Sequence, residues 1–99
     1  MSTLSELLNE FTKILYDLDP MGLKSPKETE YEGEALSILC RFVEHQIDHS
    51  NIRVVNDIII GVWRGWFDEV PTEQTLALIS LPLFSAYVKR YPKKNGTNR

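Results

Sequence analysis

The sequence predicts an all-α fold, a single-domain bundle of four to five helices. Apolar residues recur at spacings of three and four along most of the chain, which is the period of an amphipathic helix. Threonine and proline residues stand where these periodic segments start and stop. The chain has 99 residues, of which 42% are hydrophobic and 25% charged, a composition typical of one globular domain. We expect this domain to cover residues 1–92, and residues 93–99 to form a disordered basic tail.

The first helix is expected over residues 5–18, where leucine, isoleucine and phenylalanine recur at helical spacing. Thr3, followed by Glu6 three residues later, has the form of a capping box. Pro20 disfavours helical geometry in the residue before it and therefore ends the helix.

A loop is expected over residues 19–28. Asp19-Pro20 favours the start of a turn, and Gly22 can adopt a positive φ. Because Met21 and Leu23 are apolar, we expect this loop to pack against the core.

The second helix is expected over residues 30–47, with Thr29 and Glu32 as a second capping box. Cys40 lies in the apolar run 36–43, and we interpret it as a small buried hydrophobic residue. As the only cysteine of the chain it cannot form an internal disulfide, which is typical of a reducing compartment. The residues expected on the inner face of this helix are Tyr31, Ala35, Ile38, Leu39, Phe42 and Val43.

The third helix is expected over residues 52–67, where apolar residues again keep helical spacing. Residues 54–63 are rich in β-branched side chains, so a strand is the competing interpretation. The helix is favoured because the spacing continues over more than ten residues and no second strand is visible to pair with the first.

The last part of the chain is expected to form two shorter helices. Thr72 should cap the first of them, which would run to about Ile79. Pro82 would remove a backbone hydrogen bond and clash with the preceding turn. We therefore expect a kink or break there, followed by a final helix that ends near Arg90.

Charge is distributed unevenly along the chain, whose net charge is −3. Residues 1–48 carry ten acids and four bases, whereas residues 49–99 carry four acids and seven bases. The acidic half is therefore the candidate surface for a basic protein partner. The alternative interpretation is that these carboxylates belong to solvated helix faces.

Several functional classes are disfavoured by the sequence. The first residues lack the positive segment and apolar run of a signal peptide, and no segment reaches the ~20 apolar residues of a membrane span. We therefore expect a cytoplasmic protein without membrane contact. No serine lies in a glycine elbow and no glycine loop could hold a phosphate, so we expect neither an enzyme nor a bound cofactor.

Two further kinds of site remain as alternatives. His45 and His49 are four residues apart and could share one helix face as metal ligands. No third ligand is evident, and histidine near a helix C-terminus is favoured by the helix dipole alone, so we predict no bound metal. A basic set with neighbouring aromatic residues could bind single-stranded nucleic acid, but aromatic residues at helical spacing are more often core, so we expect no nucleic-acid partner. This set comprises Arg64, Lys89, Arg90, Lys93 and Lys94, with Trp63, Trp66, Tyr87 and Tyr91.

Residues 19–23, DPMGL, and residues 28–39, ETEYEGEALSIL, carry a family resemblance. They resemble a pattern of small bacterial helical proteins that include the YugE-like family and immunity proteins of polymorphic toxin and contact-dependent inhibition systems. In that pattern Asp-Pro precedes a hydrophobic-Gly-hydrophobic triplet, and Asp-Glu-Tyr-Asp-x-Glu-Ala precedes an apolar helix. Thr29 and Glu32 stand here where the pattern has aspartates. The resemblance covers about a fifth of the chain and implies an all-helical fold of four or five helices.

The resemblance and the acidic charge together lead us to expect an immunity protein that binds and neutralises a basic toxin domain, with a nuclease as the expected toxin. An acidic surface would speed the encounter with such a partner. The expected partner-binding residues are Glu28, Glu30 and Glu34, and the region around Arg64 and Trp66 is the second choice. The alternative function is a non-catalytic scaffold or regulatory helical module. The sequence leaves the oligomeric state open.

Overall fold

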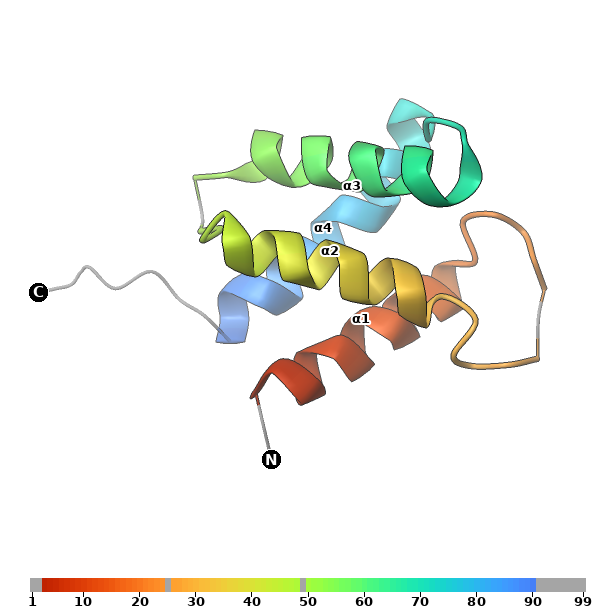
Figure 1. The fold of residues 1–99 in the computed structure, drawn as a ribbon, viewed down its shortest axis with the longest axis horizontal. Helices are drawn as coiled ribbons and strands as arrows, with labels where there is room; N and C mark the ends of the chain where they lie inside the picture. Colours follow the sequence, from red (N-terminus) through yellow and green to blue (C-terminus); the bar gives the residue numbers. More distant parts are fainter. Residues whose placement is uncertain (1–2, 25, 49, 91–99) are drawn as a thin grey trace, which may run out of the picture.

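The computed structural model describes residues 3–24, 26–48 and 50–90. Within these residues the chain forms four helices and no strand, so the all-α bundle is confirmed. Figure 1 shows α1, α2 and α3 running in alternating directions, with α4 crossing behind them. None of the described helices is long and apolar enough to span a membrane. The helices are α1 Thr3–Leu18, α2 Glu32–Glu44, α3 Ile52–Phe67 and α4 Glu73–Arg90.

The core is built from the inward faces of all four helices. Three aromatic rings connect α1, α2 and α4, since Phe42 meets Phe11 and Tyr87 edge to face at centroid distances of 5.6 and 5.3 Å. On α3, Trp63 packs against Phe67 at 5.2 Å and is 1% exposed. Edge-to-face geometry places the positive rim of one ring against the negative face of the next. These contacts fix the helices relative to one another beneath the surface that α1 and α2 form.

The starts of the first two helices differ from the sequence prediction. Thr3 is the first described helical residue of α1 and not a cap before it. In α2 the cap position is taken by Tyr31, which makes no side-chain cap hydrogen bond, and Thr29 lies two residues further out in a turn. The capping box of Thr29 and Glu32 was therefore a wrong prediction. The structural reason is that the hydroxyl of Tyr31 is anchored to the preceding loop, which fixes the residue at which α2 begins.

The second helix also ends earlier than expected. Gln46 has a φ of 51°, and its N–H donates to the carbonyl of Val43, while the N–H of Ile47 donates to the carbonyl of Phe42. This pair of hydrogen bonds is a Schellman motif, which normally has glycine at the left-handed position. Ile47 is 3% exposed, so its burial favours the turn. The absence of glycine from this position is why the sequence pattern placed the end three residues too late.

The third helix has the expected bounds, which settles the choice between helix and strand for residues 54–63. The fourth helix differs, because it continues through Pro82 as one element, and the expected break was wrong. Proline at 82 leaves the carbonyl of Leu78 without its usual donor. Leu78 lies on the exposed side of α4, where water has access to the backbone. Burial of Ile79 and Leu83 on the opposite side stabilises the helix on both sides of the proline.

The cap at Thr72 is confirmed, since its Oγ1 accepts a hydrogen bond of 3.1 Å from the N–H of Thr75. We expect Thr72→Ala to lower the free energy of unfolding by about 1 kcal/mol, the usual effect of losing such a cap. Thr29→Ala is the matched control and should change it much less, because Thr29 is an exposed turn residue outside α2. Urea denaturation of both variants provides the measurement. Equal effects would contradict the observed helix starts.

Candidate functional site

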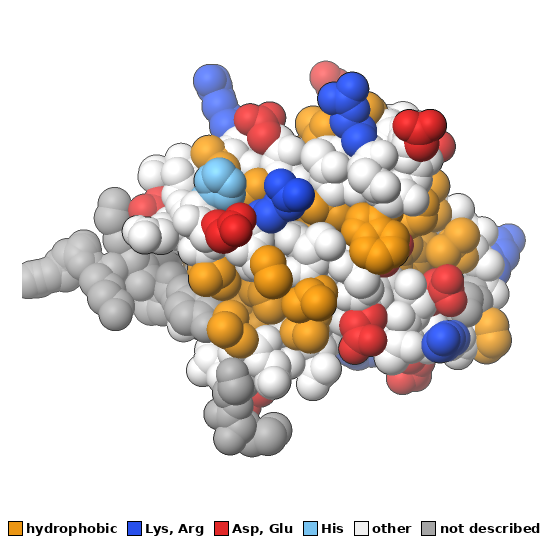
Figure 2. Space-filling view, in the orientation of Figure 1, with side chains coloured by type: hydrophobic (Ala, Val, Ile, Leu, Met, Phe, Trp, Pro, Cys, Tyr) orange, Lys and Arg blue, Asp and Glu red, His pale blue; other side chains and the backbone are white. Residues whose placement is uncertain are grey.

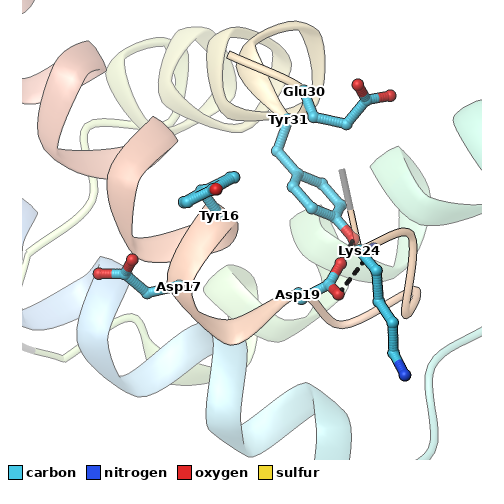
Figure 3. A pocket seen from close by; sticks show the side chains of 6 residues that line it. All are labelled: Tyr16, Asp17, Asp19, Lys24, Glu30 and Tyr31. Atoms are coloured by element: carbon cyan, nitrogen blue, oxygen red, sulfur yellow. Dashed lines mark hydrogen bonds between the residues drawn. The ribbon is translucent and has the colours of Figure 1, made fainter. Parts of the chain in front are cut away.

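The loop after α1 is organised around the carboxylate of Asp19. This carboxylate accepts hydrogen bonds from the N–H groups of Leu23 and Lys24, at 2.9 and 3.0 Å, and from the hydroxyl of Tyr31, at 2.8 Å. The same hydroxyl accepts a bond of 3.1 Å from the N–H of Met21. Figure 3 shows Tyr31 reaching from the segment before α2 to Asp19 at the end of α1. The loop is therefore tied to both helices through one buried phenol.

These contacts shift the titration of both partners in opposite directions. The hydrogen bond from Tyr31 is the main cause that lowers the pKa of Asp19; partial burial opposes it, and the backbone donors of Lys24 and Leu23 lower the pKa further. Burial is the main cause that raises the pKa of Tyr31 to about 12, with a further contribution from Asp19. At neutral pH the pair is thus a phenol that donates to a carboxylate. The arrangement holds a proton in place and is structural.

The loop is also attached to the core, as expected. The indole N–H of Trp63 donates to the sulfur of Met21 at 3.2 Å, and Gly22 adopts a φ of 64° that lets the chain turn toward Lys24. Met21 is half-buried, whereas Leu23 remains 45% exposed. Asp19, Gly22 and Tyr31 all belong to the pattern that carries the family resemblance. Their contacts here give that pattern a structural role in joining α1, the loop and α2.

The three glutamates expected to bind a partner do not form one surface. Glu28 and Glu30 are exposed, whereas Glu34 is only 6% exposed. Glu34 follows Tyr31 by three residues and precedes Ile38 by four, so the helix turns it toward the inner face. Burial raises the pKa of its carboxyl, and the charge of Glu30 adds to this effect. Glu34 is therefore removed from the candidate binding surface.

Other carboxylates take its place. Two adjoining hollows lie between the C-terminal half of α1 and the segment that leads into α2. One is seen in Figure 3, where Tyr16 and Tyr31 flank it and Lys24 extends outward. Together the two hollows are lined by five carboxylates and two lysines. These residues are Asp17, Asp19, Glu28, Glu30, Glu32, Lys13 and Lys24.

A third hollow continues between the same two helices and is apolar. Cys40 lines it and is exposed, so its expected burial was wrong. Val43, expected on the inner face, is 41% exposed in the same hollow. Both lie on the outer side of α2 because its inner side is filled by Tyr31, Ala35, Ile38, Leu39 and Phe42. The sequence of α2 contains a second apolar stripe, and the prediction did not separate this stripe from the one that faces the core. The hollow is lined by Leu4, Ser5, Leu8, Leu36, Leu39, Cys40, Val43 and Glu44.

The alternative sites are not assembled by the described residues. His45 stands beyond the end of α2, and His49 lies outside the described residues. Among the residues that the structure describes, no three metal-ligating side chains gather. Of the aromatic residues weighed for nucleic-acid binding, Trp63 and Tyr87 are in the core and Tyr91 lies outside the described part of the chain.

Among the members of that aromatic set that the structure describes, Trp66 is the exposed one, with 53% of its surface accessible. Its indole N–H donates to the hydroxyl of Ser37 at 3.2 Å. A Cβ on Gly33 would lie 2.6 Å from the Trp66 ring, so the indole rests directly on the backbone of α2. Trp66 thus joins α3 to α2, and glycine at 33 allows this close approach.

The hollows along α1 are therefore the candidate site among the described residues, and a further hollow lined by Ser37 and Arg41 lies on the outer side of α2. No known protein family, curated protein or solved structure matches this chain.

Proposed function

We propose that this chain is a non-catalytic immunity protein that binds and neutralises a basic toxin domain in the cytoplasm. The observation that carries the proposal is the excess of carboxylates around the two polar hollows at the junction of α1 and α2. The family resemblance of residues 19–39 supports it. A nuclease is the toxin class that this chemistry fits, because a nuclease carries a basic cleft for phosphate groups.

The acidic surface favours a fast encounter with such a partner. Exposed carboxylates at the rim of an interface act mainly on the association rate, and their effect falls with ionic strength. Glu28, Glu30 and Glu32 are exposed and lie on the segment that leads into α2 and on its first turn. Asp19 belongs to the same region but is engaged in holding the loop, so it contributes charge and not a free side chain.

The proposal predicts that Glu28→Lys, Glu30→Lys and Glu32→Lys together slow association with the toxin domain at least tenfold and remove most of its salt dependence. A catalytically inactivated toxin domain encoded directly upstream would be the binding partner, and stopped-flow mixing at several salt concentrations the measurement. Glu34 is left unchanged because a lysine at this buried position would unfold the protein.

A matched control carries Asp57→Lys, Glu69→Lys and Glu73→Lys, three exposed acids of α3, the following turn and α4. It changes the net charge equally but leaves the junction of α1 and α2 intact. Equal slowing by both sets would show that only net charge matters. Absence of binding to the neighbouring toxin, with no protection of cells that express it, would refute the immunity function.

A further inference from the structure

Three hollows follow one another along α1: an apolar one against α2, and two polar ones against the first residue of α2 and the segment before it. The apolar hollow is lined on α1 by residues between Leu4 and Leu8, and the first polar hollow by residues between Asn9 and Asp17. The second polar hollow begins at Tyr16, which it shares with the first. Because the two helices run in opposite directions, the apolar end lies at the end of α2 and the acidic end at its start. We call this feature the α1–α2 groove.

The two ends of the groove differ in chemistry. At one end Leu4, Leu36 and Val43 are each 41–47% exposed, which is unusual for three large apolar side chains around one hollow. At the other end carboxylates outnumber lysines by five to two. Figure 2 shows hydrophobic side chains gathered over one part of this face and red carboxylates beyond them toward the loop that leads into α2. A partner that binds here must therefore match an apolar region at one end and an acidic region at the other end.

We propose that the α1–α2 groove binds an amphipathic helix of a protein partner, with bulky apolar side chains at one end and lysine or arginine at the other. This inference rests on the proposed function and identifies the surface and the kind of segment that it binds. Apolar side chains at helical spacing would cover Leu4, Leu36 and Val43, and basic side chains would meet Asp17, Glu28 and Glu32. The lining of α1 from residue 4 to residue 17 corresponds to roughly 20 Å, or about four turns of an occupying helix.

Charge also argues against a second copy of this chain as the occupant. In an antiparallel pair the apolar end of one groove would cover the acidic end of the other and remove its carboxylates from water without a basic partner. In a parallel pair the two acidic ends would face and repel each other. Residues 91–99, YPKKNGTNR, are basic but lack the large aliphatic side chains that the apolar end requires. A basic amphipathic helix satisfies both ends.

The probe for this proposal is a fluorescein-labelled peptide of 16 residues. Leucines at spacings of three and four occupy its first half, lysines at the same spacing its second half, and alanine and glutamine the other positions. Fluorescence anisotropy with the full chain should show saturable binding that weakens with salt. A peptide with glutamate in place of lysine should bind at least tenfold more weakly, because it meets the acidic end with like charge.

Two double variants locate the binding surface. Leu36→Gln with Val43→Gln should weaken binding of the probe at least tenfold. Leu78→Gln with Leu81→Gln is the matched control, since these leucines of α4 are 57% and 58% exposed and lie outside the groove, and it should bind like the wild type. All four positions are exposed, so circular dichroism should show both variants folded.

Absence of saturable binding, or binding that only the α4 variant weakens, would overturn the proposal. A dimer in sedimentation that Leu36→Gln with Val43→Gln dissociates would make a second copy the occupant, and tighter probe binding after removal of residues 91–99 would make the tail the occupant. Either result would also overturn it.

If the neighbouring toxin binds this double variant normally but binds the Glu28, Glu30 and Glu32 variant poorly, the groove inference fails while the immunity function stands. If the probe binds the groove but the toxin does not bind at all, the immunity function fails and the groove belongs to a scaffold.

Discussion

Trp63→Ala is expected to lower the free energy of unfolding by about 3–5 kcal/mol, the usual effect of removing a large aromatic side chain from a core. Trp63 is the largest fully buried side chain among the described residues, and it contacts both Phe67 and Met21. Its loss would leave a cavity in α3 and release the loop that Met21 anchors. Because a domain of this kind has a total stability of about 5–15 kcal/mol, the variant should lose a large share of its stability and unfold at a clearly lower denaturant concentration. Guanidinium denaturation followed by circular dichroism measures the change.

Trp66→Ala is the matched control, three residues further along the same helix. Trp66 is 53% exposed and rests on the backbone at Gly33, so we expect a loss of about 1 kcal/mol or less. A similar loss in both variants would contradict the observed orientation of α3. Because Trp66 was the second choice for the partner surface, Trp66→Ala also tests partner binding in a variant whose stability is nearly unchanged.

The all-α class, the approximate positions of the helices and the bounds of α3 could be predicted from the sequence, whereas α4 was expected as two helices and forms one. Helical spacing identifies a buried face where most apolar residues share one face, as in α3, where Val55, Ile58, Ile59, Val62 and Trp63 are buried although Trp66 is exposed. In α2 and α4 this condition fails, because Leu36 and Val43 on one helix and Leu78 and Leu81 on the other are large, apolar and exposed. Which apolar stripe faces inward is decided by the neighbouring helices, and the pattern of a single helix does not contain that information.

Three of the misplaced boundaries have tertiary causes. Gln46 adopts a left-handed conformation without being glycine, and burial of Ile47 accompanies it. Pro82 is accommodated because the flanking turns of α4 are packed on the core. Thr29 has a cap sequence, yet α2 begins later because Tyr31 is anchored to Asp19. In each case long-range packing outweighed a local preference of about 1–3 kcal/mol.

The candidate site could be predicted in part. The acidic region before α2 was visible in the sequence, and its residues Glu28 and Glu30 are exposed in the structure. Glu32 replaces Glu34 on the proposed binding surface because α2 starts at Glu32 and its first turn directs Glu34 toward the core. Asp17 and Leu4 were not recognised, because their relation to α2 depends on how α1 packs against it. The groove is a property of two helices together.

The hydrogen bonds around Asp19 position the acidic end of this groove. They fix the loop that carries Lys24 and the residue before α2, whereas backbone hydrogen bonds from Glu30 to Lys27 and from Glu32 to Thr29 form the turn that carries Glu28 and Glu30. A rigid loop presents its charges at constant positions, which favours a defined encounter with a partner. The family resemblance and the proposed binding surface therefore meet at the same structural element.

Tyr31→Phe is expected to lower the free energy of unfolding by about 1–3 kcal/mol at pH 7. The change removes only the hydroxyl, so the core packing of the ring is kept. It leaves the N–H of Met21 without its acceptor and takes one donor from the carboxylate of Asp19. A partly buried hydrogen bond to a charged group falls in the lower part of this range, and the N–H of Met21 left without its acceptor adds to the loss. Tyr16→Phe, in the same hollow, is the control, because the structure shows no hydrogen bond of its hydroxyl to the described residues.

The pH dependence of this difference provides a second, independent test. Asp19 has a lowered pKa in the folded chain, so its contribution is complete above the unfolded value of about 4 and is lost as the pH falls through the folded pKa. Tyr31 has a pKa raised to about 12, so its contribution is complete below the unfolded value of about 10 and is lost as the pH rises toward 12. The stability difference between wild type and Tyr31→Phe should therefore be largest between about pH 4 and pH 10 and shrink on both sides. Urea denaturation within this pH range and on both sides of it measures the difference. A difference that stays constant below pH 3, or a Tyr16→Phe variant that loses as much stability, would show that the phenol of Tyr31 does not hold the loop through Asp19.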